Sequence, residues 1–185
     1  MMSDRQNYKP GPAIGATVQK EGDRWILVVK RELHHPREKV WQALTEPAQL
    51  REWAPFDADR SLGSVGPVTL STVGAPTPQI SVTSVTRAEF PSVLAYRWGD
   101  NDLRWELEQI PAGTLLTLWH NIDRRYIAMG AAGWQICLDV LDSWVAGKPL
   151  GRIVGGQAME FEWPRLNAEY GKQFGVETPD WPRKA

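Results

Sequence analysis

A chain of 185 residues is long enough for one domain that buries roughly two-thirds of its unfolded surface. Its 21 Lys and Arg are balanced by 22 Asp and Glu, which leaves no basic surface for a phosphate backbone, so we expect no nucleic-acid partner. The single cysteine, Cys137, excludes an internal disulfide and a multi-cysteine zinc site. No run approaches the roughly 20 apolar residues of a membrane span. These features favour a cytoplasmic protein that does not insert into membranes.

The amino-terminal part of the chain begins with a polar segment. Residues 1–19 are interrupted by two prolines, and we expect them to form a disordered or extended leader. The segment 24–33, RWILVVKREL, is rich in β-branched and aromatic residues and predicts the first strand. Two short helices should follow at 36–44 and 47–53, because each begins with a proline and carries apolar residues at helical spacing.

The middle of the chain has the pattern of an antiparallel meander, in which short alternating runs are separated by Gly, Pro and Asp. It predicts strands at 66–72, 79–88, 92–98, 102–110 and 114–122, which makes a sheet of about six strands with the first. In the last three strands the apolar residues alternate with charged ones, so one face should be dry and the other wet. The dry face contains Leu94, Tyr96, Trp98, Leu103, Trp105, Leu107, Leu116, Leu118 and His120.

A dry sheet face needs a cover, and the candidate is a long helix at 128–146. Its apolar residues, Trp134 and Leu138 among them, recur every three or four positions. The glycine-rich segment 151–158 reads as a linker. After it, 160–174 should form a short helix that packs back on the domain, so we divide the chain into a domain at 20–150 and an extension at 151–185.

Four sequence blocks, in order and at suitable spacing, carry a family resemblance. The stretch RELHHPREKVWQALTEPAQLREW resembles the amino-terminal signature of the START-like SRPBCC superfamily, in the branch homologous to the activator of the heat-shock-protein-90 ATPase. The stretch AAGWQICLDVLDSWVAGKPLG resembles the carboxy-terminal helix signature of the same branch, and LAYRW and RWEL are similar to its central strands. The resemblance covers about residues 20–150.

The resemblance implies an α+β helix-grip fold like that of the birch-pollen allergen. In this fold a curved antiparallel sheet of about six strands holds a long carboxy-terminal helix, and two short helices follow the first strand. Members of the superfamily hold lipids, steroids, polyketides or plant hormones between sheet and helix, and some are cyclases, aromatases or hydrolases. We therefore expect a hydrophobic or aromatic small-molecule ligand.

Nine residues are expected to face the space between sheet and helix, where aromatic walls suit a flat or apolar ligand. They are Trp53, Tyr96, Trp98, Trp105, Leu107, Leu118, His120, Trp134 and Leu138. For any one of them, core packing is the simpler explanation. His120 is the only inward titratable group, and it must find a hydrogen-bond partner or titrate; the alternative is a satisfied core histidine.

Other titratable groups predict no chemistry. His34, His35 and Glu38 lie at a strand-to-helix junction without a further ligand at metal spacing, so we interpret them as a solvated turn. Glu106 and Glu108 are roughly 7 Å apart by strand rise, but they alternate to the wet face. We expect no metal, no cofactor and no catalytic residue.

Three functional classes remain. A small-molecule carrier or sensor ranks first, because the resemblance implies a cavity and the sequence supplies an apolar lining. An enzyme of the cyclase, aromatase or hydrolase kind ranks second, since only His120 could act as its acid or base. A co-chaperone that activates a chaperone ATPase ranks third, because the sequence shows no discrete charged patch for that partner. Whether the chain forms a homodimer stays open.

Overall fold

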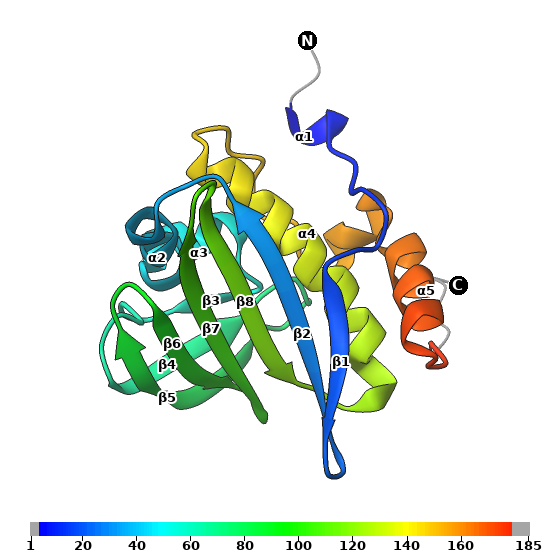
Figure 1. The fold of residues 1–185 in the computed structure, drawn as a ribbon, viewed down its shortest axis with the longest axis horizontal. Coiled ribbons are helices and arrows are strands. Elements are labelled where there is room, and N and C mark those ends of the chain that lie inside the picture. The colour runs from blue at the N-terminus through cyan, green and yellow to red at the C-terminus, as the bar shows by residue number, and fades with distance from the viewer. Residues whose placement is uncertain (1–3, 179–185) are drawn as a thin grey trace.

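An eight-stranded antiparallel sheet curls around one long helix, α4, in the computed structural model, which describes residues 4–178 (Figure 1). The strand order is β1-β2-β8-β7-β6-β5-β4-β3. The strands are β1 (Ala16–Glu21), β2 (Arg24–Leu33), β3 (Phe56–Ala58), β4 (Gly66–Thr72), β5 (Gln79–Glu89), β6 (Val93–Trp98), β7 (Asn101–Ile110) and β8 (Gly113–Asn121). This arrangement confirms the expected helix-grip fold.

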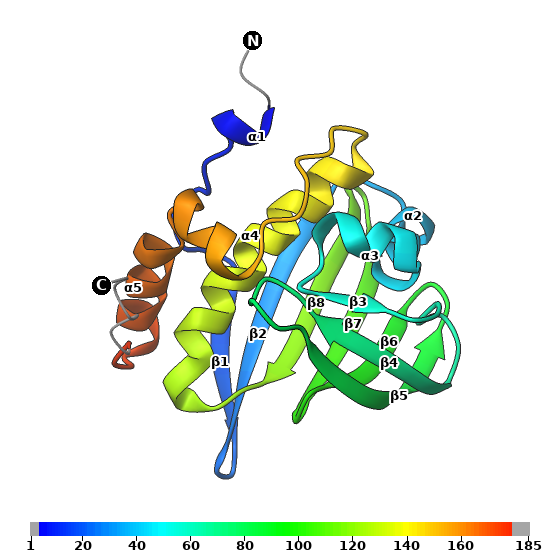
Figure 2. The same ribbon diagram turned by 180° about the vertical axis from the view of Figure 1, so that it is seen from behind.

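The helices lie on one side of the sheet and at one of its ends. They are α1 (Asp4–Asn7), α2 (Arg37–Thr45), α3 (Pro47–Trp53), α4 (Ile127–Val145) and α5 (Trp163–Phe174), with short 3-10 turns η1 (Arg124–Tyr126) and η2 (Gly155–Phe161). Seen from behind, α4 crosses the concave face of the sheet, and α2 and α3 lie near one end of the sheet (Figure 2). The helix α5 packs against α4. The apolar spacing of 128–146 therefore predicted α4 to within one residue at each end.

The expected count of about six strands was wrong, because two strands had no recognisable signal. In β1, four of six residues are exposed, so a polar edge strand lacks the apolar alternation that marks a half-buried one. It forms only by pairing with β2, with Ala16 opposite Val29. The strand β3 has three residues and pairs with β4. Because β1 begins at Ala16, it takes up the end of the segment that we expected to be a leader.

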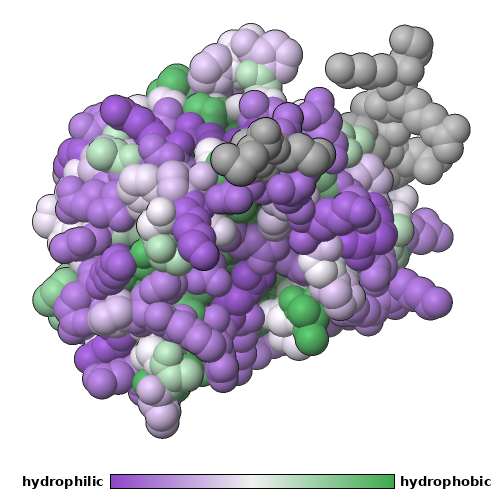
Figure 3. Space-filling model, turned by 90° about the horizontal axis from the view of Figure 1, so that it is seen from above, coloured by the Kyte–Doolittle hydropathy of each residue, from purple (hydrophilic) through white to green (hydrophobic). Residues whose placement is uncertain are grey.

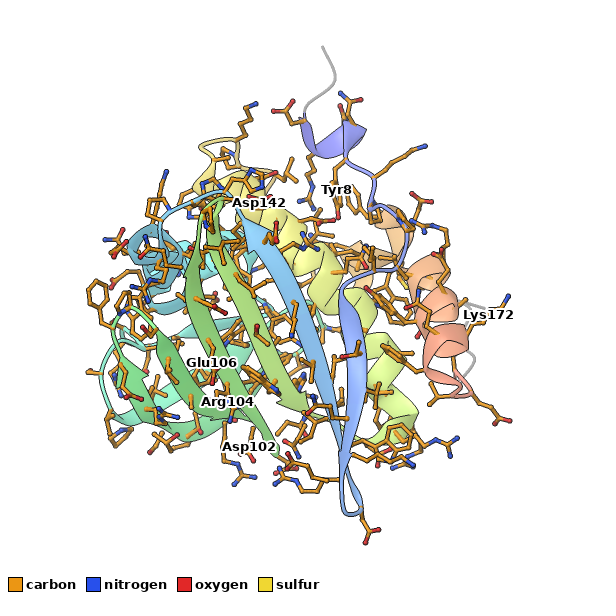
Figure 4. The ribbon with its side chains drawn as sticks, in the orientation of Figure 1. Tyr8, Asp102, Arg104, Glu106, Asp142 and Lys172 are labelled. Carbon is orange, nitrogen blue, oxygen red and sulfur yellow. The ribbon has the colours of Figure 1, made fainter. Side chains whose placement is uncertain are left out.

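The register of the central strands places the predicted dry residues together. Trp105 of β7 lies between Leu94 of β6 and Leu118 of β8, and Leu103 lies opposite His120. All five are buried. Charged residues of β7 alternate to the outer face, where Asp102, Arg104 and Glu106 lie along the strand (Figure 4). The core of the domain therefore lies between this sheet face and α4.

The first residues of the described chain lie against the carboxy-terminal part. The Arg5 guanidinium donates hydrogen bonds to the carbonyl oxygens of Leu150, Gly151 and Arg152 at 2.8–3.2 Å. The Tyr8 hydroxyl donates to a carboxylate oxygen of Asp139 on α4. The Arg5 bonds fix the amino-terminal segment to the chain that follows α4, and the Tyr8 bond fixes it to α4 itself.

Candidate ligand-binding site

A half-open pocket of about 610 Å³ lies at one end of the space between sheet and helix. Its walls are the first half of α4, the ends of β6 and β8, the loop after β4, and the segment from Ile153 to Trp163. His120 and the indoles of Trp98 and Trp134 form its inner wall. We call this space the His120 pocket.

The structure brings three of the nine expected site residues to the His120 pocket, namely Trp98, His120 and Trp134. They come from β6, β8 and α4. The Trp98 ring centroid lies 5.8 Å from that of His120 and 5.9 Å from that of Trp134. The Trp98 Nε1 donates to the Thr72 hydroxyl at 2.7 Å, which ties β6 to the end of β4.

The other six expected site residues lie in the part of the same space that side chains fill. They are Trp53, Tyr96, Trp105, Leu107, Leu118 and Leu138, and none is more than 3% exposed. Trp53 packs edge-on against Trp105, with ring centroids 6.0 Å apart. The Trp53 Nε1 donates to the Ala43 carbonyl oxygen at 2.8 Å, and the Trp105 Nε1 donates to the Tyr96 hydroxyl at 3.1 Å. These polar atoms are satisfied by protein, so this region, which we call the filled half, is a packed core.

His120 is the buried polar group of the pocket wall. Its Nδ1 accepts a hydrogen bond from the Trp134 Nε1 at 3.0 Å, and an indole N–H can only donate. The remaining ring proton therefore resides on Nε2, which has no hydrogen-bond partner in the described part of the chain. The residue is 2% exposed, and burial lowers the pKa of the imidazole from 6.5 to about 4. At neutral pH it is an uncharged donor.

Two glycines close one side of the His120 pocket. Gly74 in the loop after β4 and Gly155 at the start of η2 both have positive φ, at 98° and 58°. A Cβ at Gly155 would overlap the Gly74 carbonyl, so only glycine permits this approach of the two backbones. The Gly156 N–H donates to the Gly74 carbonyl oxygen at 3.4 Å. The segment 151–158, which we interpreted as a linker, therefore supplies part of the pocket lining, from Ile153 onward.

Arg152 anchors that wall to α3 and β3. Its guanidinium donates to the carbonyl oxygens of Leu50 and Phe56 and forms an ion pair with Asp57. The Arg152 side chain is 17% exposed, so these bonds form in a partly water-excluded setting. Arg5 binds the carbonyl oxygens of residues 150–152, so both guanidinium groups fix the segment that leads into the pocket wall.

Gly133, in the second turn of α4, is the sequence signal that could have located the pocket. Gly130 and Gly133 both line it, although glycine in a helix interior costs roughly 1 kcal/mol relative to alanine. A Cβ at Gly133 would meet nothing within 4 Å. The surface of α4 at Gly133 therefore borders open space, whereas a Cβ at Gly130 would come within 3.0 Å of the Ile122 side chain. The face with Leu138 and Leu141 is buried.

The histidine pair and the cysteine show no reactive environment. His35 lies 2.9 Å from a carboxylate oxygen of Asp142, and among residues 4–178 no three His, Cys, Asp or Glu are grouped to hold a metal ion. Cys137 lines the pocket, but burial raises the pKa of its thiol to about 12. It therefore remains protonated and acts as a small apolar group.

The two glutamates of β7, Glu106 and Glu108, are not among the residues that line the His120 pocket. Glu106 lies on the outer face of β7 and pairs with Arg104 at 3.3 Å, away from the pocket (Figure 4). The face of the molecule that is at the top in Figure 1 is mainly hydrophilic, with small separate apolar groups (Figure 3). None of the helices within 4–178 combines the length and apolar character needed to cross a bilayer.

Comparison with known proteins identifies the family. The sequence model described as "Activator of Hsp90 ATPase homolog 1-like protein" matches residues 34–146, more than half of the chain. The chain belongs to this family. The match spans α2 to α4 and includes the three pocket residues Trp98, His120 and Trp134. The family resemblance of the four sequence blocks is thereby confirmed.

Solved structures share the fold of this family member at low sequence identity. CalU16 from Micromonospora echinospora has a TM-score of 0.64 at 23% identity, covering 89% of this chain and 92% of that one. The conserved protein EF2215 from Enterococcus faecalis, whose function is unknown, has a TM-score of 0.63 at 18% identity, covering 85% and 89%. An AHSA1-like protein from Aeromonas hydrophila has 0.53 at 18%, covering 66% and 92%. A search of the curated proteins finds no significant match.

Proposed function

We propose that the protein binds an apolar or aromatic small molecule in the His120 pocket and serves as a carrier or sensor. The observation that carries the proposal is the pocket itself, since its volume of about 610 Å³ falls within the range typical of ligand sites, roughly 300–1,000 Å³. Aromatic rings and methionines form much of its wall, among them Trp98, Trp134, Met129 and Met159. Such walls suit a flat apolar ligand.

The protonation state of His120 favours binding over acid–base catalysis. A general base needs a free lone pair, but Nδ1 already accepts from Trp134, and Nε2 carries the ring proton. A general acid at neutral pH needs a pKa near 7, whereas burial lowers that of His120 to about 4. A carrier or sensor therefore remains the better candidate than a cyclase or hydrolase that would depend on this side chain.

Filling the His120 pocket from α4 tests the proposal. Gly133→Phe places an aromatic side chain in open space, whereas Gly133→Ala, the matched control, adds only a methyl group where a Cβ meets nothing within 4 Å. We expect the Phe variant to bind the neutral fluorescent probe N-phenylnaphthylamine at least about tenfold more weakly than the Ala variant. Probe titration followed by fluorescence gives both affinities.

Native mass spectrometry of the protein incubated with extracted lipids and aromatic metabolites then identifies natural ligands. A ligand retained by the wild type and by Gly133→Ala, and lost from Gly133→Phe, supports the pocket as its site. Equal probe binding by the two variants, with both folded by circular dichroism, would contradict the proposal.

A further inference from the structure

We infer that the His120 pocket selects uncharged, largely aromatic molecules that carry a hydrogen-bond acceptor such as a ketone oxygen, which receives the Nε2–H of His120. This inference rests on the proposed function and adds the chemical class of the ligand. Three observations lead to it: the fixed tautomer of His120, the missing partner of its Nε2, and the charge of the pocket lining.

Trp134 fixes which ring nitrogen of His120 is the donor. Because the indole N–H has no acceptor capacity, its 3.0 Å bond to Nδ1 requires a lone pair there, and the neutral ring must carry its proton on Nε2. Trp98 packs against the same ring at a centroid distance of 5.8 Å. The imidazole thus packs against two indoles, which also contact each other, and carries its one N–H on Nε2.

The Nε2–H is left without a partner among residues 4–178. Buried polar groups in proteins are nearly always hydrogen-bonded, so an unpaired donor in a pocket wall indicates that something else supplies the acceptor. The Thr72 hydroxyl accepts from Trp98 and keeps its own O–H as a donor, and Gln79 is an exposed residue at the pocket edge. Among the pocket-lining residues of the described chain, His120 is the one with a buried side-chain polar atom that lacks a protein partner.

The lining of the pocket favours an uncharged ligand. No Asp, Glu, Lys or Arg of the described chain is among its lining residues, and His120 itself is neutral at physiological pH. A carboxylate or ammonium placed there would lose its hydration without gaining an opposite charge, which is strongly unfavourable. A neutral acceptor loses less hydration and gains the His120 bond.

Three matched tricyclic compounds separate these requirements. Fluorene has the aromatic rings alone, fluorenone adds one carbonyl oxygen, and fluorene carboxylate adds an anionic group. Equilibrium dialysis measures their dissociation constants with the wild type, with His120→Phe, and with Met159→Leu as a control that keeps His120. The informative quantity is the preference for fluorenone over fluorene, because it cancels the general effect of each substitution on apolar binding.

We expect the preference for fluorenone to fall about tenfold in His120→Phe, as the loss of one hydrogen bond predicts, and to stay unchanged in Met159→Leu. Fluorene carboxylate should bind the wild type at least about tenfold more weakly than fluorenone. An unchanged preference in His120→Phe, or equal binding of the carboxylate, overturns the inference while leaving the proposed function intact. Failure of all three compounds to bind the wild type overturns both.

A measurement on the wild type alone covers the case in which His120→Phe does not fold. The infrared carbonyl stretch of bound fluorenone should lie at lower frequency than in hexane, as for a ketone that accepts a hydrogen bond. Nitrogen NMR shifts of His120 should report the Nε2–H tautomer in the same complex. A carbonyl stretch like that in hexane, or a proton on Nδ1, overturns the inference.

Discussion

The space between the sheet and α4 has two halves built from the same kinds of residue, yet one is core and the other is a pocket. In the filled half, Trp53 from α3 packs against Trp105, and both indole N–H groups have protein acceptors. In the His120 pocket, Gly133 of α4 presents no side chain, and the His120 Nε2 has no acceptor within 4–178. Aromatic residues on an inward strand face therefore do not define a binding site. Whether such residues form a core or line a pocket depends on the side chains that lie opposite them.

This comparison predicts that the two halves differ most in what they contribute to stability. Trp105→Ala should lower the free energy of unfolding by about 3–5 kcal/mol, because it removes a large side chain from a fully packed site. Trp98→Ala should cost less, about 1–2 kcal/mol, since the ring is partly exposed at the pocket. Urea unfolding measures both. A larger loss for Trp98→Ala would break the distinction between the two halves.

Buried His120 predicts a loss of stability in acid. Its pKa is about 4 in the folded protein and 6.5 when exposed, so the unfolded state takes up the proton first as the pH falls. The contribution of His120 to the free energy of unfolding should be constant well above pH 6.5 and should fall by about 3 kcal/mol as the pH approaches 4. The groups packed on the ring, Trp98, Trp134 and the paired Leu27 and Leu103, are not titratable in this range.

Urea unfolding between pH 7 and pH 4 checks this, with His120→Phe as the reference that keeps the titrations of all other groups. The wild type should lose more stability over this interval than the variant. Parallel pH profiles would show that His120 is not held neutral in the folded state, which would weaken the case for an uncharged donor in the pocket.

A smaller effect than that of His120 is expected at Arg152, which holds the Ile153–Trp163 wall of the pocket to α3 and β3. Arg152→Leu removes the bonds to Leu50, Phe56 and Asp57, and should lower stability by about 2 kcal/mol and weaken binding of N-phenylnaphthylamine. The control Arg24→Leu breaks an exposed ion pair with Asp102 and should cost under about 1 kcal/mol without affecting the probe. Equal probe binding by both variants would show that the pocket wall does not depend on Arg152.

Much of the fold could be predicted because its elements carry local periodicity. The alternation in β7 placed Trp105 and Leu107 inward and Glu106 outward, and the spacing of Trp134, Leu138 and Leu141 predicted α4. The strand β1 was missed because its residues are mostly polar and its pairing with β2 is a tertiary contact. Local pattern reports which face of an element is apolar.

The sequence by itself determined the family, the grip of α4 by the sheet, and the inward direction of Trp98, His120 and Trp134. Only the tertiary structure decided that these three border open space, because that depends on the contact of Gly74 with Gly155, far apart in the chain. It also decided the tautomer of His120, since its partner Trp134 belongs to another element. Periodicity fixes a side chain's direction, whereas the distance to the opposing backbone, and hence the room for a ligand, is set by contacts between distant segments.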